Sequence, residues 1–234
     1  MSSPSTAAGG DPLVPPTSKT AYALERLRQE IQSGAIRPGE PLRQADLARR
    51  FGVSPTPVRE ALRLLEAEGT ISYSPHRGAT VQELSPDRIR DVYLLRSSVE
   101  GLATRLAVER MTPEALERIK ALHVALVDGA KRGEQPEQLA NWNRDLHLEI
   151  CATASPLITS HASSLWRMIP ARITMWEDAE LVGRLNDQHA GIVEAIVAGD
   201  ADLAAERMAA HVMTAADQRL TLISGELGGD DAPV

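Results

Sequence analysis

The sequence predicts a mainly α-helical protein of two domains, an N-terminal one that ends in a small β-hairpin and a C-terminal antiparallel helical bundle. Its 234 residues are enough for two modest hydrophobic cores. Only seven residues are aromatic, and much of the apolar content is Ala and Leu, which favours closely packed helices over a β-sandwich. From residue 85 onward, apolar residues recur at helical spacing almost without interruption.

Both ends of the chain are predicted to be flexible tails, residues 1–17 and 223–234, because they are rich in small residues, Gly and Pro. The N-terminal stretch lacks the early basic cluster and apolar core of a signal peptide. No apolar run approaches the roughly 18 residues that span a bilayer. The one cysteine, Cys151, cannot form an internal disulfide. We therefore expect a cytoplasmic protein without a membrane partner.

The N-terminal domain is predicted over residues 18–82 and begins with two helices. The stretch SKTAYALERLRQEIQSG has apolar residues near helical spacing, and Gly34 suits the end of that helix. The turn RPGEPL then precedes a short second helix over RQADLARRF.

A third helix is predicted to start within FGVSPTPVREALRLLEAEG, residues 51–69. Gly52 can end the preceding helix, and Ser54 can cap the next one by accepting a hydrogen bond from a backbone N–H. Pro55 then falls at the first helical position, where its missing donor has no cost, and Pro57 lies in the same turn. The inward face of this helix is predicted to comprise Val58, Ala61, Leu62 and Leu65.

Residues 70–81, TISYSPHRGATV, predict the β-hairpin. They alternate as two short strands, joined by a turn through Pro75 and Gly78.

The second and third helices fit the helix-turn-helix pattern, with Ala48, Gly52 and Val58 at intervals of four and six. In this motif the second helix enters the major groove of DNA by its N-terminal end. Arg59, on its outward face, could reach a guanine edge or a phosphate. Any two short helices with a glycine turn fit the pattern, but the hairpin at the expected distance indicates a winged helix-turn-helix. Residues 19–80 carry ten Lys or Arg against seven Asp or Glu, whereas residues 81–234 carry fifteen against twenty-four, which supports DNA contact through the N-terminal domain.

The motifs PGEPL, LARRFGVSPTPVREAL and RGATV resemble the DNA-binding domain of the GntR family of bacterial regulators. The resemblance implies contacts with double-stranded operator DNA by seven residues: Arg43, Ser54, Thr56, Pro57, Arg59, Arg77 and Gly78. Pro55 stands where some members of the family have a basic residue, so the operator sequence cannot be transferred from them.

The C-terminal domain is predicted over residues 85–222 as a series of helices. Three of them begin at Ser-Pro or Thr-Pro pairs, in which a capping residue precedes a proline at the first helical position. One of these is predicted to run from Pro156 to Trp176. The last two helices are expected to fold back on each other around the turn AGD at residues 198–200.

Three histidines of this domain are expected to lie close together. His147 shares a helix face with Asn143, four residues earlier. If two antiparallel helices meet at Gly199, His189 and His211 lie about 15 and 18 Å from the turn, and therefore at similar depth. Such a set could bind a metal inside a bundle, or it could simply form hydrogen bonds in a polar pocket.

The stretches LRSSVEGLATRLA, NRDLHLEI and QHAGIVEAIVAGDADLAAERMAAHV resemble the FCD domain, an antiparallel helical ligand-binding bundle of one GntR subgroup. The resemblance implies a divalent metal, Zn²⁺ or Ni²⁺, held by an Asp and three His, with a small carboxylate effector bound against it. The three histidines correspond to His147, His189 and His211, while the Asp position holds Asn143, a neutral and poorer ligand. Arg96 and Arg172 are the candidates for binding the effector carboxylate.

Together these patterns predict a homodimeric transcription regulator that is not an enzyme. One alternative is a metal-independent regulator with a histidine-lined effector pocket. A metal-dependent enzyme is a second, but no general base is evident beside the histidines and an enzyme needs no winged helix. A non-specific architectural DNA binder is a third, but an acidic chain gains little from bulk phosphate attraction. Release from one operator by a ligand would separate the first interpretation from the last two.

Overall fold

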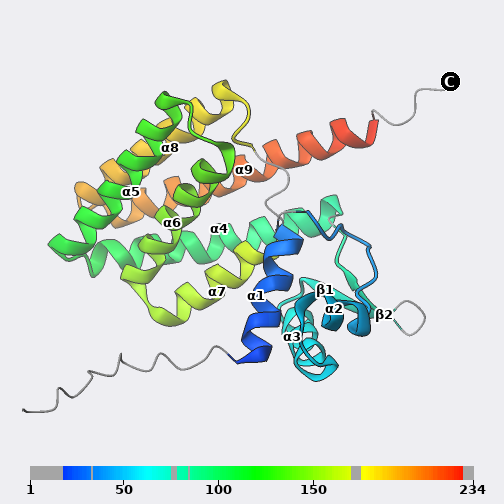
Figure 1. Ribbon diagram of the computed structural model, residues 1–234. Helices are drawn as coiled ribbons and strands as arrows, with labels where there is room; N and C mark the ends of the chain where they lie inside the picture. The colour runs from blue at the N-terminus through cyan, green and yellow to red at the C-terminus, as the bar shows by residue number, and fades with distance from the viewer. Residues whose placement is uncertain (1–17, 33, 75–77, 84, 170–174, 229–234) are drawn as a thin grey trace, which may run out of the picture.

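The computed structural model describes residues 18–32, 34–74, 78–83, 85–169 and 175–228, and it confirms a mainly helical fold with two hydrophobic cores. One core belongs to the N-terminal winged helix-turn-helix domain and the other to the C-terminal helical bundle. Figure 1 shows the small domain beside one end of the bundle, next to the start of α4 and to α7. No helix of the described residues is long and apolar enough to cross a membrane.

The N-terminal domain comprises three helices and a two-stranded antiparallel sheet. Its elements are α1 (Lys19–Gln32), α2 (Gln44–Phe51), α3 (Pro55–Ala67), β1 (Ile71–Ser74) and β2 (Gly78–Val81). The two strands pair in a register that runs from Ile71 opposite Val81 to Ser74 opposite Gly78. The predicted turn residue Pro75 lies outside the described residues.

The tight turn between α2 and α3 forms as the sequence predicted, with one exception. Gly52 adopts a left-handed conformation with φ 66°, and its N–H donates to the carbonyl oxygen of Ala48. Pro55 is the first residue of α3, and all four predicted inward residues are fully buried. Ser54 has the extended backbone of an N-cap, but its side chain accepts no capping hydrogen bond within the described part of the chain, so that detail was wrong.

The bundle contains six helices over the described residues. They are α4 (Pro86–Glu109), α5 (Pro113–Arg132), α6 (Pro136–Ala154), α7 (Pro156–Arg167), α8 (Ala179–Val197) and α9 (Ala201–Gly228). The predicted caps at Ser85 and Thr112 are confirmed, since each side chain accepts a hydrogen bond from a backbone N–H in the first turn of its helix.

Two predicted boundaries in the bundle were wrong. Helix α7 ends at Arg167 instead of continuing to Trp176, because Pro170 cannot continue a helical hydrogen-bond ladder and disfavours a helical residue before it. Helix α9 continues to Gly228, past the predicted start of the tail at residue 223. Ile223 is buried against the bundle core, and this contact extends the ordered helix.

Helices α4 and α9 pack along each other within the bundle (Figure 1). The Ser97 hydroxyl of α4 donates to the carbonyl oxygen of Ala209 at 3.2 Å. Helices α8 and α9 are joined by the turn at Gly199, whose φ of 72° permits the reversal. The antiparallel pair α8 and α9 and the turn at Gly199 both agree with the prediction.

Candidate functional site

The predicted DNA-contacting residues lie mostly on the surface of the N-terminal domain. Ser54 and Thr56 are exposed at the start of α3, and the side chain of Arg59 is 49% exposed in the next turn. Pro57 is buried, so its ring packs into the domain core and does not point outward. Arg77 lies outside the described residues.

A groove of about 670 Å³ separates the start of α2 from the wing formed by β1 and β2. Arg43 and Gly78, two of the predicted contact residues, both line this groove. Gln44 and Tyr73 line it as well, and the Gln44 amide donates to the Tyr73 hydroxyl at 3.4 Å across it. The sequence analysis missed both residues, although an aromatic side chain on the outward face of a strand was a usable signal.

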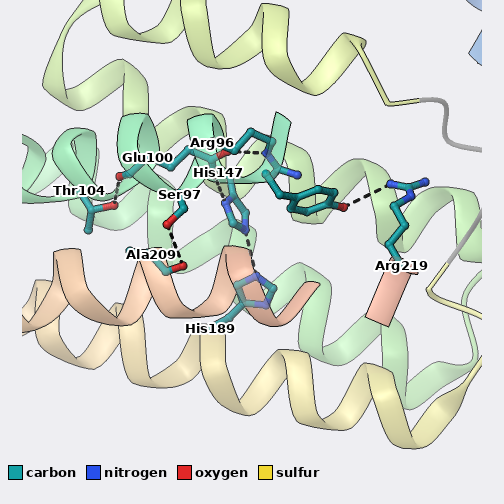
Figure 2. Close-up of polar contacts among 9 residues, drawn as sticks. Arg96, Ser97, Glu100, Thr104, His147, His189, Ala209 and Arg219 are labelled. Carbon is teal, nitrogen blue, oxygen red and sulfur yellow. Dashed lines mark hydrogen bonds and ion pairs between the residues drawn. The ribbon is translucent and has the colours of Figure 1, made fainter. Parts of the chain in front are cut away.

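The three predicted histidines converge inside the bundle. His147 comes from α6, His189 from α8 and His211 from α9, and their metal-binding nitrogens all lie within 4.8 Å of one another. The three residues are 1%, 1% and 4% exposed. The Nε2 atoms of His147 and His189 face each other at 3.2 Å (Figure 2).

Two further side chains fix the orientation of these rings. Nδ1 of His147 lies 2.5 Å from a carboxylate oxygen of Glu100, and Nδ1 of His211 lies 2.8 Å from the amide oxygen of Gln188. Because each oxygen accepts a hydrogen bond, each Nδ1 carries a proton, which directs Nε2 of each ring toward the centre of the cluster. Partners of this kind orient histidines at metal sites. Neither Glu100 nor Gln188 was foreseen.

Two buried amides lie one helical turn before two of the histidines. Asn143 is 8% exposed and precedes His147 by four residues on α6, as predicted. Asn186 is 9% exposed and precedes His189 by three residues on α8, and its Oδ1 has no hydrogen-bond partner among the described residues. Each amide therefore shares a helix face with a histidine of the cluster.

Arg96, a predicted effector contact, is buried beside the histidine cluster. Its Nε donates to Glu100 at 2.7 Å, as Figure 2 shows, and its guanidinium lies 3.6 Å from the centre of the Trp166 ring. Tyr93 packs on the same guanidinium at 5.0 Å and accepts a hydrogen bond from Arg219 of α9 at 3.3 Å. The other predicted contact, Arg172, lies outside the described residues.

Burial and charge set the protonation states in this region. Burial alone would raise the pKa of Glu100, but Arg96 and His147 outweigh it and lower the pKa to about 2. Burial, followed by the neighbouring imidazoles, lowers the pKa of both His189 and His211 well below 6.5. Burial, with the charge of Glu100, raises the pKa of the Cys151 thiol to about 12. The cluster therefore combines an ionised Glu100 with two imidazoles, those of His189 and His211, that burial keeps neutral.

The arrangement fits a divalent metal. A tetrahedral Zn²⁺ ion with three imidazole ligands separates their nitrogens by about 3.3 Å. The Nε2 atoms of His147 and His189 are 3.2 Å apart. Three imidazole ligands would leave a fourth position for another group, such as an amide, a water or a carboxylate.

Comparison with known proteins identifies both domains. The model of the bacterial regulatory proteins of the gntR family matches residues 19–81, and that of the FCD domain matches residues 91–214. The chain belongs to the GntR family.

Relatives with similar sequences are transcription regulators. The chain is 32% identical to the HTH-type transcriptional regulator McbR of Escherichia coli over 74% of its own length and 80% of that protein. It is 30% identical to a probable D-xylose utilization operon transcriptional repressor of Paenarthrobacter nicotinovorans, over 93% and 94% of the two chains. The solved structure of E. coli McbR/YncC superimposes with a TM-score of 0.74 and 25% identity, covering 87% of this chain and 98% of that one. This GntR protein is therefore a DNA-binding regulator in its general class.

Proposed function

We infer that this GntR protein is a metal-dependent transcription regulator, in which a small carboxylate controls the affinity of the winged helix-turn-helix domain for operator DNA. The observation that carries this proposal is the convergence of three buried histidines from three helices. Residues 18–82 bind the operator, and residues 85–222 bind the effector and join two copies of the chain. The protein acts in the cytoplasm. The proposal covers both repression and activation of transcription.

The divalent metal, Zn²⁺ or Ni²⁺, is bound by His147, His189 and His211, with Asn143 or a water as a further ligand. The alternative is a metal-independent pocket in which the histidines only form hydrogen bonds. The metal is favoured because three imidazoles converge, with candidate ligand nitrogens within 4.8 Å of one another, whereas a direct hydrogen bond would pair only two of them.

The effector carboxylate is expected beside Arg96. Glu100 engages Nε of this guanidinium, and the two terminal nitrogens carry four more N–H donors that match a carboxylate in pairs. Arg172 is the second candidate contact. An effector that bound the metal and Arg96 together would be recognised by charge and by geometry, which is how a small anion gains specificity in a buried site.

Operator DNA is contacted by Arg43, Ser54, Thr56, Arg59, Arg77 and Gly78, with buried Pro57 setting the shape of the first turn of α3. Helix-turn-helix proteins commonly bind two-fold operators as dimers. Leu94, Leu95 and Leu102 of α4 are each more than half exposed and form an apolar stripe that would suit a dimer interface.

The regulator hypothesis is preferred to a metal-dependent enzyme for a local reason. Glu100 is the carboxylate that touches the histidine cluster, and it already binds both Arg96 and His147. Its low pKa makes it a weak base.

Elemental analysis of the full chain, purified without chelators or a histidine tag, tests the metal. We expect one Zn²⁺ or Ni²⁺ per chain in the natural sequence, the same amount in His161→Ala, and little in His189→Ala. His161 is an exposed histidine of α7 and serves as the matched control. Natural protein that lacks metal and does not bind added Zn²⁺ in a calorimetric titration would contradict the metal site.

A DNA selection tests the regulator function. Operator sequences are enriched from a random double-stranded pool, and the affinity of the full chain for the enriched sequence is compared with that for a scrambled one. We expect specific binding at least 10³-fold tighter, as in other sequence-specific proteins. Equal affinity for both sequences would leave only a non-specific DNA binder.

A further inference from the structure

The C-terminal end of the recognition helix α3 is held by arginines from three other helices. Arg28 of α1 and Arg167 of α7 both form ion pairs with the carboxylate of Glu68, the C-cap residue directly after α3. Arg88, at the start of α4, donates to the carbonyl oxygen of Gly69. We call Arg28, Arg88 and Arg167 the junction arginines. Arg88 and Arg167 belong to the bundle. The bundle therefore contacts the recognition helix at its C-terminal end, away from the N-terminal end that is expected to enter the major groove.

The contacts at this junction are partly buried and incompletely satisfied. The side chains of Arg28, Glu68 and Arg167 are 24%, 18% and 29% exposed. The Arg167 Nε lies 3.6 Å from a Glu68 oxygen, outside hydrogen-bond distance. Among the described residues, both of these atoms are buried without a hydrogen-bond partner. A shift of a few tenths of an ångström would convert this contact into a hydrogen bond.

Gly69 brings the end of α7 close to the same point. Its φ of 71° lets the chain reverse directly after α3, and the methyl group of Met168 lies 3.6 Å from where a Cβ on Gly69 would be. Arg167 and Met168 are therefore consecutive residues of the bundle that both touch the end of α3.

The residue before them touches the histidine cluster. The Trp166 ring lies 3.6 Å from the Arg96 guanidinium and packs edge-on against His147, with ring centroids 5.3 Å apart. The C-terminal end of α7 therefore contacts the candidate ligand site through Trp166 and the C-cap of the recognition helix through Arg167, and Met168 lies beside the same point. A helix is stiff over one turn, so a displacement of Trp166 is transmitted to its neighbours.

We propose that Arg167 is a positioning residue for DNA binding, which moves with Trp166 and thereby sets the orientation of α3. A ligand at the histidine cluster changes the packing of Trp166, and Arg167 either tightens or releases its contact with Glu68. The coupling requires two arrangements with different ligand affinities, and in this proposal they differ in the contact between Arg167 and Glu68. This step rests on the proposed function for the identity of the ligand, but the link between Trp166 and α3 does not depend on it.

Hydrogen exchange of the full chain, followed by mass spectrometry over residues 58–70, tests the link without any ligand. We expect Trp166→Phe to raise exchange at the end of α3 by about fivefold, the upper end of the change that follows the loss of one ion-pair contact. Arg167→Ala should raise it by a similar factor, and the double variant should show no further increase. Arg118→Ala removes an arginine of α5 that pairs with Glu149 far from the junction, and it should leave these residues unchanged.

Additive effects of the two substitutions, or no effect of Trp166→Phe on residues 58–70, would overturn the proposal. A purely structural role for Trp166 would instead raise exchange across the bundle and leave α3 unchanged. A second arm adds Zn²⁺ to metal-free protein, and we expect exchange at the end of α3 to change in the natural sequence but not in Arg167→Ala. Zn²⁺ that binds without this change contradicts the proposal. Failure of Zn²⁺ to bind contradicts only the metal site, and the ligand-free arm still decides the link.

Discussion

Replacement of Glu100 by Gln should destabilise the bundle strongly at neutral pH, and the loss should depend on pH. The variant keeps the shape of the side chain but removes the charge that faces Arg96, whose side chain is only 5% exposed. The pKa of Glu100 is about 2 in the folded protein and 4.5 for an unperturbed carboxyl group, a difference that corresponds to about 3 kcal/mol of unfolding free energy. Removal of one partner from other buried ion pairs costs about 3–5 kcal/mol, which agrees.

The sign of the pH dependence follows from the lowered pKa. Ionised Glu100 stabilises the folded state fully above 4.5, and this contribution is lost as the pH falls toward 2. The difference in unfolding free energy between the natural sequence and Glu100→Gln should therefore be constant near neutrality and shrink by more than half at about pH 3.

Urea unfolding followed by tryptophan fluorescence measures this quantity for the bundle alone, because Trp142, Trp166 and Trp176 all belong to it. Metal is removed from both proteins first, so that altered metal affinity does not contribute. The control is Glu180→Gln, since the Glu180 side chain is 86% exposed and its pair with Arg184 should contribute less than about 1 kcal/mol. Equal stability of Glu100→Gln and the natural sequence at pH 7 would refute the reasoning about the buried pair.

Three further outcomes are expected. Arg59→Ala should weaken specific operator binding by about 1–3 kcal/mol, measured in titrations at fixed salt, if the side chain contacts a base. Arg90→Ala, which replaces an exposed arginine of α4, should leave the affinity unchanged. A lower melting temperature of Arg59→Ala with unchanged operator affinity would contradict a DNA contact by Arg59. His211→Ala should lower the affinity for Zn²⁺ in a calorimetric titration and leave basal DNA binding intact, and an unchanged affinity would remove His211 from the ligand set. Cys151 should resist a thiol reagent in the folded protein at pH 8, where a pKa of about 12 leaves only about one thiol in ten thousand ionised, and rapid modification would contradict its burial.

The fold was predictable where a single residue determines the local backbone. Proline at the first helical position fixed the starts of α3, α4, α5 and α7, and the glycine at position 52 fixed the turn before α3. The predictions were wrong where tertiary contact decides. The periodic pattern did not show that α7 stops at Arg167, and the composition of the C-terminal residues did not show that Ile223 packs on the bundle core.

The candidate site was predictable to the same extent. A hairpin of two helices places residues at equal distances from its turn side by side, so the convergence of His189 and His211 followed from counting. Glu100 precedes His147 by 47 residues, and no spacing rule connects them. An acidic residue four positions after Arg96 usually means an ordinary surface pair, and only burial of both side chains shows that it orients an imidazole. Trp166 was hidden for a similar reason, because its partners come from α4 and α6.

The separation of the two hydrophobic cores has a consequence for biosynthesis. Every buried residue of the N-terminal core lies between positions 23 and 81, so this domain can complete its core as soon as that segment has left the ribosome. The bundle cannot do the same, because its first helix, α4, packs against its last, α9. During translation of the intervening helices, the apolar face of α4 lacks its packing partner α9, which is synthesised more than ninety residues later. A nascent chain stalled before residue 201 should therefore hold a folded DNA-binding domain beside an unfinished bundle with exposed apolar surface, the state in which chaperones would engage it.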